Sequence, residues 1–222
     1  MEIVDEFCDL LQSHANRDKV VALTSYILKL WGSTSNRQEL LTASTRLAAT
    51  RATLRLFDDA AALKVLYTYG LGKHEGPWWG ALGVTNSVFT LTFLQAEKLQ
   101  WLLDTGVLKV NDEIAYKIRT AHKLFWSLSA FLGFIRSIRT VHLSAQQLKE
   151  KTTKCAPARF TQATLTSTKY FLDIIHLVNW LPKGWLWGSS IKTTHAAAIA
   201  TTSGILGLVM HYHGKRLLSQ KS

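Results

Sequence analysis

Proline and cysteine are scarce in this sequence, which has 3 prolines and 2 cysteines among 222 residues. So few prolines leave long stretches without a turn signal, which favours an almost entirely helical chain over a sheet-based fold. The spacing of the two cysteines, Cys8 and Cys155, indicates neither a metal site nor a disulfide framework. Their scarcity is typical of a protein in a reducing compartment.

The N-terminal residues lack the features of a cleaved leader. A secretory signal needs a basic start and an uninterrupted apolar core, and a transit peptide needs arginines. Residues 2–12 instead form an acidic amphipathic pattern whose apolar face consists of Ile3, Val4, Phe7, Leu10 and Leu11. The sequence also has no Asn-x-Ser/Thr glycosylation acceptor. We therefore expect a membrane protein of this sequence to be inserted through internal signals.

Acidic residues are almost missing from the second half of the chain. Up to Glu113 there are 11 basic and 13 acidic residues, whereas from Ile114 onward there are 15 basic and 2 acidic residues. A basic half is typical of contact with nucleic acid or with an anionic membrane surface. The basic residues are spread between apolar segments, and no nucleic-acid recognition module is present. We expect membrane lipid as a partner and no nucleic acid.

Spacings that would indicate catalysis or a cofactor are missing as well. The histidine pair His211 and His213 has no third ligand nearby, and residues two apart on a helix point in different directions. Asp58 and Asp59 are adjacent on a predicted helix, so their carboxylates do not converge on one substrate atom. The sequence therefore predicts no enzyme activity, no cofactor and no metal.

Helical patterns fill most of the chain, and they predict an all-α membrane protein. Asn16, Asn36 and Asn111 are candidate N-caps, a break is expected at 32–35, and residues 136–159 are predicted to be a basic loop. The predicted helices are 16–30, 36–69, 76–96, 112–141 and 160–180, followed by an uncharged segment at 193–214.

The second half of the predicted helix 36–69 has a narrow charged arc. Projected at 100° per residue, Arg51, Arg55, Asp58 and Asp59 fall within roughly 100° of one another. Apolar side chains take most of the remaining circumference, among them Leu47, Leu54 and Phe57. An exposed Arg55–Asp59 pair adds only a few tenths of a kcal/mol to a helix. We therefore interpret the arc as a face toward solvent or lipid headgroups. The broad apolar circumference of the helix suits packing against neighbouring helices at least as well as insertion into lipid.

Two segments are candidates to cross a bilayer, which takes ~20 residues. Residues 193–214 contain no Asp, Glu, Lys or Arg, so we predict one span at 192–213. A second span is predicted at 121–143, where the apolar core is short and flanking basic side chains would have to snorkel. A row of small residues in the span predicted at 192–213 predicts a helix-packing or self-association face: Ala196, Ala200 and Gly204.

Tryptophans cluster at a turn that follows the predicted helix 160–180. Pro182 and Gly184 prevent the helix from continuing. Tryptophan is enriched where a membrane meets water. The turn therefore predicts an interfacial anchor that consists of Trp180, Trp185 and Trp187.

These patterns predict two regions. Residues 1–110 would form an N-terminal amphipathic helical region. Residues 111–222 would form a membrane-associated helical region that contains the two candidate spans.

Three short motifs carry a resemblance to a known family. The longest is Thr53–Asp59 (TLRLFDD), followed after a helical spacer by Tyr69–Gly72 (YGLG). Asn16–Lys19 (NRDK) precedes it, and Trp180–Gly184 (WLPKG) lies near the end. In this order, and over most of the chain, they resemble the peroxin eleven family of peroxisomal membrane proteins, most closely its gamma type.

The resemblance implies a multi-pass protein of the peroxisomal membrane, with both termini in the cytosol and one continuous family domain over 1–220. Proteins of this family elongate and tubulate peroxisomes before division, and they carry no cofactor. They associate with themselves and with other family members, and they work with dynamin-type fission machinery and its membrane adaptors. In this family an amphipathic helix in the N-terminal half remodels the bilayer. By position, that helix corresponds here to residues 47–66.

Our hypothesis is a peroxisomal membrane protein that promotes peroxisome elongation, proliferation and fission. Insertion of the remodelling helix would enlarge one leaflet and bend the bilayer, and self-association would concentrate the effect. The alternative is a non-enzymatic scaffold whose N-terminal helices recruit the fission machinery. A membrane channel or transporter is a further alternative, because the threonines between Thr193 and Thr202 could line a polar pathway.

Overall fold

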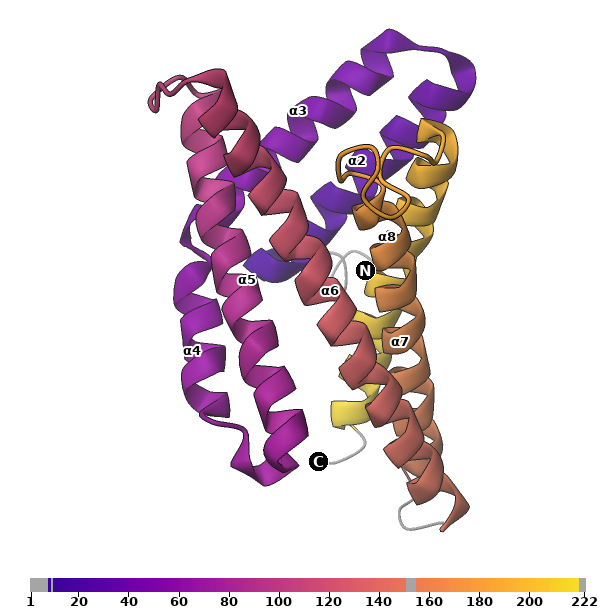
Figure 1. The fold of residues 1–222 in the computed structure, drawn as a ribbon. Helices are drawn as coiled ribbons and strands as arrows, with labels where there is room; N and C mark the ends of the chain where they lie inside the picture. The colour runs from indigo at the N-terminus through magenta and orange to yellow at the C-terminus, as the bar shows by residue number, and fades with distance from the viewer. Residues whose placement is uncertain (1–7, 9, 151–154, 220–222) are drawn as a thin grey trace.

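The computed structural model describes residues 8, 10–150 and 155–219 (Figure 1). Most of the N-terminal pattern predicted at 2–12 lies outside these residues. The described part of the chain is helical and contains no strand, so the predicted all-α fold is confirmed. In chain order the elements are α2 (His14–Ser35), α3 (Gln38–Leu54), η1 (Arg55–Phe57), α4 (Asp59–Tyr69), η2 (Lys73–Glu75), α5 (Pro77–Asp104), α6 (Asp112–Lys149), α7 (Ala156–Val178) and α8 (Thr193–Ser219).

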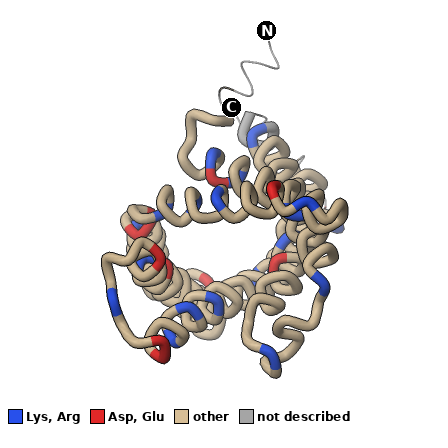
Figure 2. The backbone as a smooth tube through the Cα atoms, turned by 90° about the horizontal axis from the view of Figure 1, so that it is seen from above, with Lys and Arg blue, Asp and Glu red and all other residues tan. Residues whose placement is uncertain are grey.

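Most helices pack against the next helix in the chain, and α2 also packs against α8, near the other end of the chain. α5 packs on α6, α6 on α7 and α7 on α8, while α4 lies along the outer side of α5 (Figure 1). α2 packs against α8 and also against α3, and α3 reaches back to α5. Viewed from above, the elements therefore follow one another around a ring (Figure 2).

The helix predicted over 36–69 is wrong in two respects. It does not start at Asn36, which has a left-handed backbone (φ 53°) and ends α2 by donating its N–H to the Gly32 carbonyl. It is also interrupted at Arg55–Phe57 by a turn of 3₁₀-helix, so that α3 and α4 are separate helices. Arg51 and Arg55 bind partners on different helices, and this tertiary requirement overrides the local helical pattern.

Two segments that we predicted to be irregular are helical. The predicted break at 32–35 belongs to α2, where Ser33, Thr34 and Ser35 donate their hydroxyls to carbonyls of the preceding turn. These local hydrogen bonds let polar residues remain in a helix. The basic loop predicted at 136–159 is wrong over its first part, because α6 continues to Lys149, beyond the helix end predicted at 141.

α2 begins at His14, before the predicted cap Asn16, and α5 continues to Asp104, beyond the predicted end at 96. Three other boundaries agree with the sequence. The Asn111 side chain accepts a hydrogen bond from the N–H of Ile114 (2.8 Å) and caps α6, as predicted. α4 ends at Gly70, whose positive φ of 59° favours glycine. α7 ends at Val178, close to the predicted end at 180.

Large apolar side chains are not concentrated in the interior. The core cluster lies between α6 and α7 and is made of Ala130, Ile174, Leu177, Val178 and Leu181. Within the described residues, no large side chain is less than 2 % exposed. Exposed apolar side chains occur on the outer surfaces of α2, α6, α7 and α8: Ile27, Trp31, Phe131, Ile138, Phe171, Ile205 and Val209. An apolar exterior of this kind suits contact with lipid or another protein.

Among the described helices, one is long and apolar enough to cross a membrane: Thr193–Lys215 of α8. It coincides with the span predicted at 192–213. The second predicted span, 121–143, lies within α6, which does not meet the same criterion of length and composition. A multi-pass topology and the orientation of the termini therefore stay predictions.

Candidate membrane-remodelling site

The charged residues between α3 and α4 bind partners on other helices. Arg51 donates from Nε and Nη2 to the two carboxylate oxygens of Asp18 on α2, at 2.9 and 3.0 Å. Arg55 donates to the buried carboxylate of Glu97 on α5. We call this set the junction cluster: Arg51, Arg55, Asp58 and Asp59 with their partners Asp18, Glu97, His14 and Lys98.

Asp58 and Asp59 of the junction cluster bind different neighbours. Asp58 lies 3.1 Å from His14 Nε2 at the start of α2. Asp59 accepts a hydrogen bond from Lys98 Nζ of α5 at 2.7 Å. Within the described residues, Arg55 therefore binds Glu97 and Asp59 binds Lys98, and the two do not pair with each other. The interpretation of the arc as a face toward solvent or headgroups is wrong, because helical projection cannot tell a solvated face from one that neighbouring helices cover.

Electrostatics reinforce the pairing with α2 and α5. Burial opposes ionisation of Asp18, but hydrogen bonds and charge from Arg51 outweigh it and hold the pKa of Asp18 below its ordinary value. Burial likewise opposes the charge on Arg51, and the hydrogen bond to Asp18 nevertheless raises its pKa. The hydrogen bond from Lys98 lowers the pKa of Asp59. These groups therefore stay ionised at neutral pH.

A cavity of about 620 Å³ lies beside the junction cluster. Small residues of α3 line one side, and Trp101, Trp126 and Trp180 contribute to the other. The Arg55 guanidinium is 5.7 Å from the ring centroids of both Phe93 and Trp126. Cation–π attraction of this kind adds to the ion pair with Glu97. The α3–α4 junction is thereby anchored on α5 and α6.

Apolar side chains next to the junction cluster point outward. Leu47 and Leu54 of α3 are half-buried, whereas Phe57 is 82 % exposed. The exposure continues along α4, whose Tyr67 is 89 % exposed. We call this set the α4 apolar surface: Phe57, Leu63, Val65, Tyr67 and Leu71. The remodelling helix predicted at 47–66 thus spans the break at Arg55–Phe57 and includes the first three residues of this surface. Its role in membrane remodelling stays a prediction.

The row of small residues in α8 is covered by helices of the same chain. Ala196 and Ala200 are buried, at 8 % and 3 % exposure. A Cβ added to Gly204 would lie 3.0 Å from Leu23 Cδ1 of α2. α2 and α7 are the neighbours of α8 in the described residues. The row therefore allows close packing within the chain, and self-association through it stays a prediction.

The three tryptophans of the predicted anchor have different environments. Trp180 packs edge-on against Trp126, with ring centroids 5.3 Å apart, and lies against the core cluster. Trp185 is 47 % exposed, and Trp187 is partly exposed while its Nε1 donates to the Ile175 carbonyl at 2.9 Å. Trp185 and Trp187 are thus more accessible to a membrane interface than Trp180.

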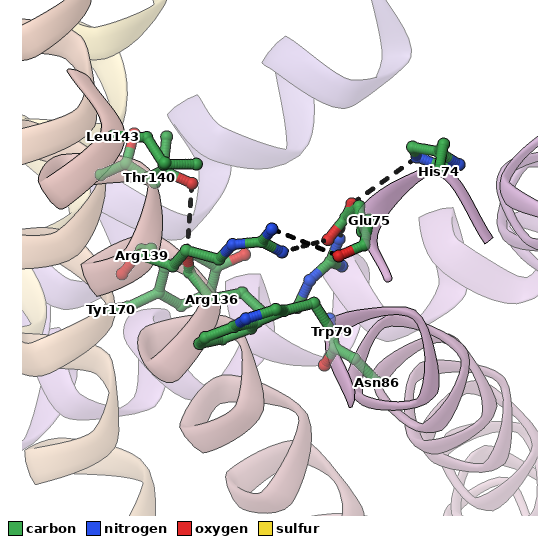
Figure 3. A pocket seen from close by; sticks show the side chains of 12 residues that line it. His74, Glu75, Trp79, Asn86, Arg136, Arg139, Thr140, Leu143 and Tyr170 are labelled. Carbon is green, nitrogen blue, oxygen red and sulfur yellow. Dashed lines mark hydrogen bonds and ion pairs between the residues drawn. The ribbon is translucent and has the colours of Figure 1, made fainter. Parts of the chain in front are cut away.

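Sequence reasoning missed a second charged site, shown in Figure 3. Arg136 and Arg139 of α6 converge on Glu75 of η2, which is remote in sequence. The signal was the spacing of the two arginines, since residues three apart share a helix face. It was not used because both arginines were treated only as basic side chains that flank the short apolar core of the predicted span 121–143.

Known proteins resemble this chain over most of its length. The family model described as Peroxisomal biogenesis factor 11 matches residues 4–211. The chain is 29 % identical to Peroxisomal membrane protein 11C of Mus musculus over 227 residues, covering 93 % of each chain. It is 26 % identical to Peroxisomal membrane protein 11C of Homo sapiens over 219 residues, covering 89 % of this chain and 90 % of the relative. No solved structure matches. Because the family model covers nearly the whole sequence, the chain belongs to the Peroxisomal biogenesis factor 11 family.

Proposed function

We propose that this protein promotes elongation, proliferation and fission of peroxisomes by remodelling their membrane. The observation that carries the proposal is the α4 apolar surface, which exposes five large side chains along one short segment. Large apolar groups that are exposed close together in one segment mark candidate sites of contact with membranes or proteins. Leu63 and Tyr67, four residues apart, share one face of α4. Membership in a peroxisome biogenesis family supports the organelle.

The packing of α4 on the rest of the molecule supports a role as a wedge in the bilayer. Ala62, Leu66 and Tyr69 are half-buried, while Leu63 and Tyr67 are exposed. α4 packs on α5, and the ion pair between Asp59 and Lys98 secures its N-terminal end. A helix fixed in this way would insert its exposed side chains into one leaflet. Binding would scale with the apolar area that enters the lipid.

The experiment is tubulation of anionic liposomes by the purified full-length protein, observed by electron microscopy. The double variant Leu63→Asp/Tyr67→Asp should lose tubulation, because two charges would have to enter the apolar layer. Thr68→Asp is the matched control, since it adds charge at another exposed position of α4. Tubulation that survives in the double variant would rule out α4 as the wedge.

We further propose that the protein acts in the peroxisomal membrane as a multi-pass protein with both termini in the cytosol. Its proposed partners are lipid, other copies of itself and of family members, and dynamin-type fission machinery with its membrane adaptors. The apolar helix Thr193–Lys215 and the names of the relatives support the membrane location. Protease protection of a tag at residue 151 tests the topology, because two spans would shield the tag inside the organelle.

A scaffold that recruits fission machinery is a second candidate function. The junction cluster favours it, because Arg51 joins α3 to α2 and Arg55 joins the following turn to α5. Many polar residues of α3 are exposed and available to a protein partner. Co-purification of fission proteins that survives Leu63→Asp/Tyr67→Asp, together with absent liposome tubulation by the unaltered protein, would favour the scaffold.

A further inference from the structure

Two arginines and one glutamate form a charged site where η2 meets α6 (Figure 3). Arg136 Nη2 donates to Glu75 Oε1 at 2.9 Å. Arg139 Nη1 donates to Glu75 Oε2 at 3.2 Å, and its Nη2 donates to the Glu75 backbone carbonyl at 3.3 Å. One carboxylate is thus shared by two guanidinium groups, and the three side chains together carry a net positive charge.

Aromatic rings hold both guanidinium groups in place. The Arg139 guanidinium is 4.5 Å from the centroid of the Trp79 ring, and that of Arg136 is 5.1 Å from the Tyr69 ring. These cation–π contacts help to orient the two arginine side chains, so their orientation does not depend on Glu75 alone. The cationic side of the site would therefore persist if the carboxylate moved away.

The space beside the arginines is larger than the carboxylate that they bind. The cavity measures about 440 Å³, and Thr140, Tyr170 and His74 are among the other residues that line it. Each guanidinium has five N–H donors, and the hydrogen bonds to Glu75 use one nitrogen of Arg136 and two of Arg139. Both arginines therefore retain donors for a larger anion.

Glu75 is carried by a segment that glycines delimit. η2 is only three residues long and lies between Gly72 (φ 64°) and Gly76 (φ 87°). Glycine adopts such positive φ values without the steric cost that other residues meet. The backbone of η2 is nevertheless packed against α5, since a Cβ added to Gly72 would lie 2.6 Å from the Gly80 Cα. The Glu75 carboxylate is bound through its side chain to Arg136, Arg139 and His74, so a rotation of that side chain is enough to free the two guanidinium groups.

We propose that Arg136 and Arg139 bind a phosphate group and that Glu75 is a built-in competitor for that position. Paired guanidinium groups match the geometry of phosphate oxygens, and a phosphate monoester offers more acceptor oxygens and charge than a carboxylate. The phosphate could belong to an anionic lipid headgroup or to a soluble phosphate ester. The proposal does not depend on membrane bending.

The test uses full-length protein in phosphatidylcholine nanodiscs. One arm titrates sn-glycerol 3-phosphate in solution, and the other replaces part of the phosphatidylcholine with phosphatidic acid, which presents the same phosphate on a lipid. Arg136→Gln/Arg139→Gln should weaken phosphate binding by roughly tenfold or more, because charged hydrogen bonds are lost. Arg119→Gln is the matched control, since Arg119 is an exposed, ion-paired arginine nearer the other end of α6.

Glu75→Gln provides the decisive measurement, because it should act in the opposite direction. Removing the competing charge should strengthen phosphate binding by roughly threefold to tenfold, since the free site is then more populated. If Glu75 only braces η2 against α6, the same variant should leave binding unchanged or weaken it. Either of those results, or the absence of binding in both arms, overturns the proposal. Binding in one arm identifies the source of the phosphate.

Discussion

α3 and α4 share one helical pattern in the sequence, yet they differ in which side chains they bury and which they expose. α3 directs Arg51 inward, where the side chain is only 9 % exposed and bound to α2. α4 directs Tyr67 outward at 89 % exposure. Charge is therefore covered in one helix and apolar surface is open in the next. The contrast assigns fold stability to α3 and surface contact to α4, and it can be tested by breaking each helix separately.

The largest effect on stability should come from Arg51→Ala. It leaves Asp18 ionised and mostly buried without its cation, and breaking a buried pair in this way costs about 3–5 kcal/mol. Denaturant unfolding in detergent should measure the loss. The double variant Arg51→Met/Asp18→Leu should recover most of it, because no buried charge is then left alone. A loss below about 1 kcal/mol for Arg51→Ala would show that α3 is not held by this pair.

Acid should weaken the same pair to a smaller extent. The pKa of Asp18 is lowered in the folded state from an ordinary value of 3.8. The contribution of Asp18 is therefore fully present above that value and is lost as the pH falls through the lower folded pKa. Unfolding measured at decreasing pH should show this loss in the unaltered protein. Asp18→Asn should lack that part of the pH dependence, and an unchanged acid profile would contradict it.

The smallest effect on stability should come from α4. Tyr67→Asp changes an exposed position, so the free energy of unfolding should change by no more than about 0.5 kcal/mol. Vesicle co-sedimentation should nevertheless fall, because a charge replaces an apolar side chain that would enter lipid. Destabilisation equal to that of Arg51→Ala would mean that the two helices do not differ in role.

The helical period of the sequence predicted where most helices lie, but it did not predict which helix faces pack against other helices and which are exposed. Asn111 and Gly70 act locally, so the start of α6 and the end of α4 could be predicted. The break at Arg55 depends on Glu97, which lies 42 positions away. No local pattern contains that information.

Residue type alone also misjudged exposure. Trp180 and Trp185 were both predicted to be interfacial, but Trp180 packs on the core and Trp185 is exposed. Their difference depends on where α6 places Trp126, which is set by tertiary packing. The motif Thr53–Asp59 proved more informative, since its charged residues belong to the junction cluster, which joins α2, α3, α4 and α5. Residues that stabilise the fold can identify the family, but they do not indicate which surface of the protein contacts its partners.

The contact between α2 and α8 makes the first and last described helices mechanical neighbours. Leu23 of α2 fits against Gly204 in the helix that is suited to cross the membrane. Force that a curving bilayer exerts on α8 would therefore reach α2 directly, and α3 through Asp18 and Arg51. The N-terminal helices would sense the state of the membrane even without touching lipid themselves.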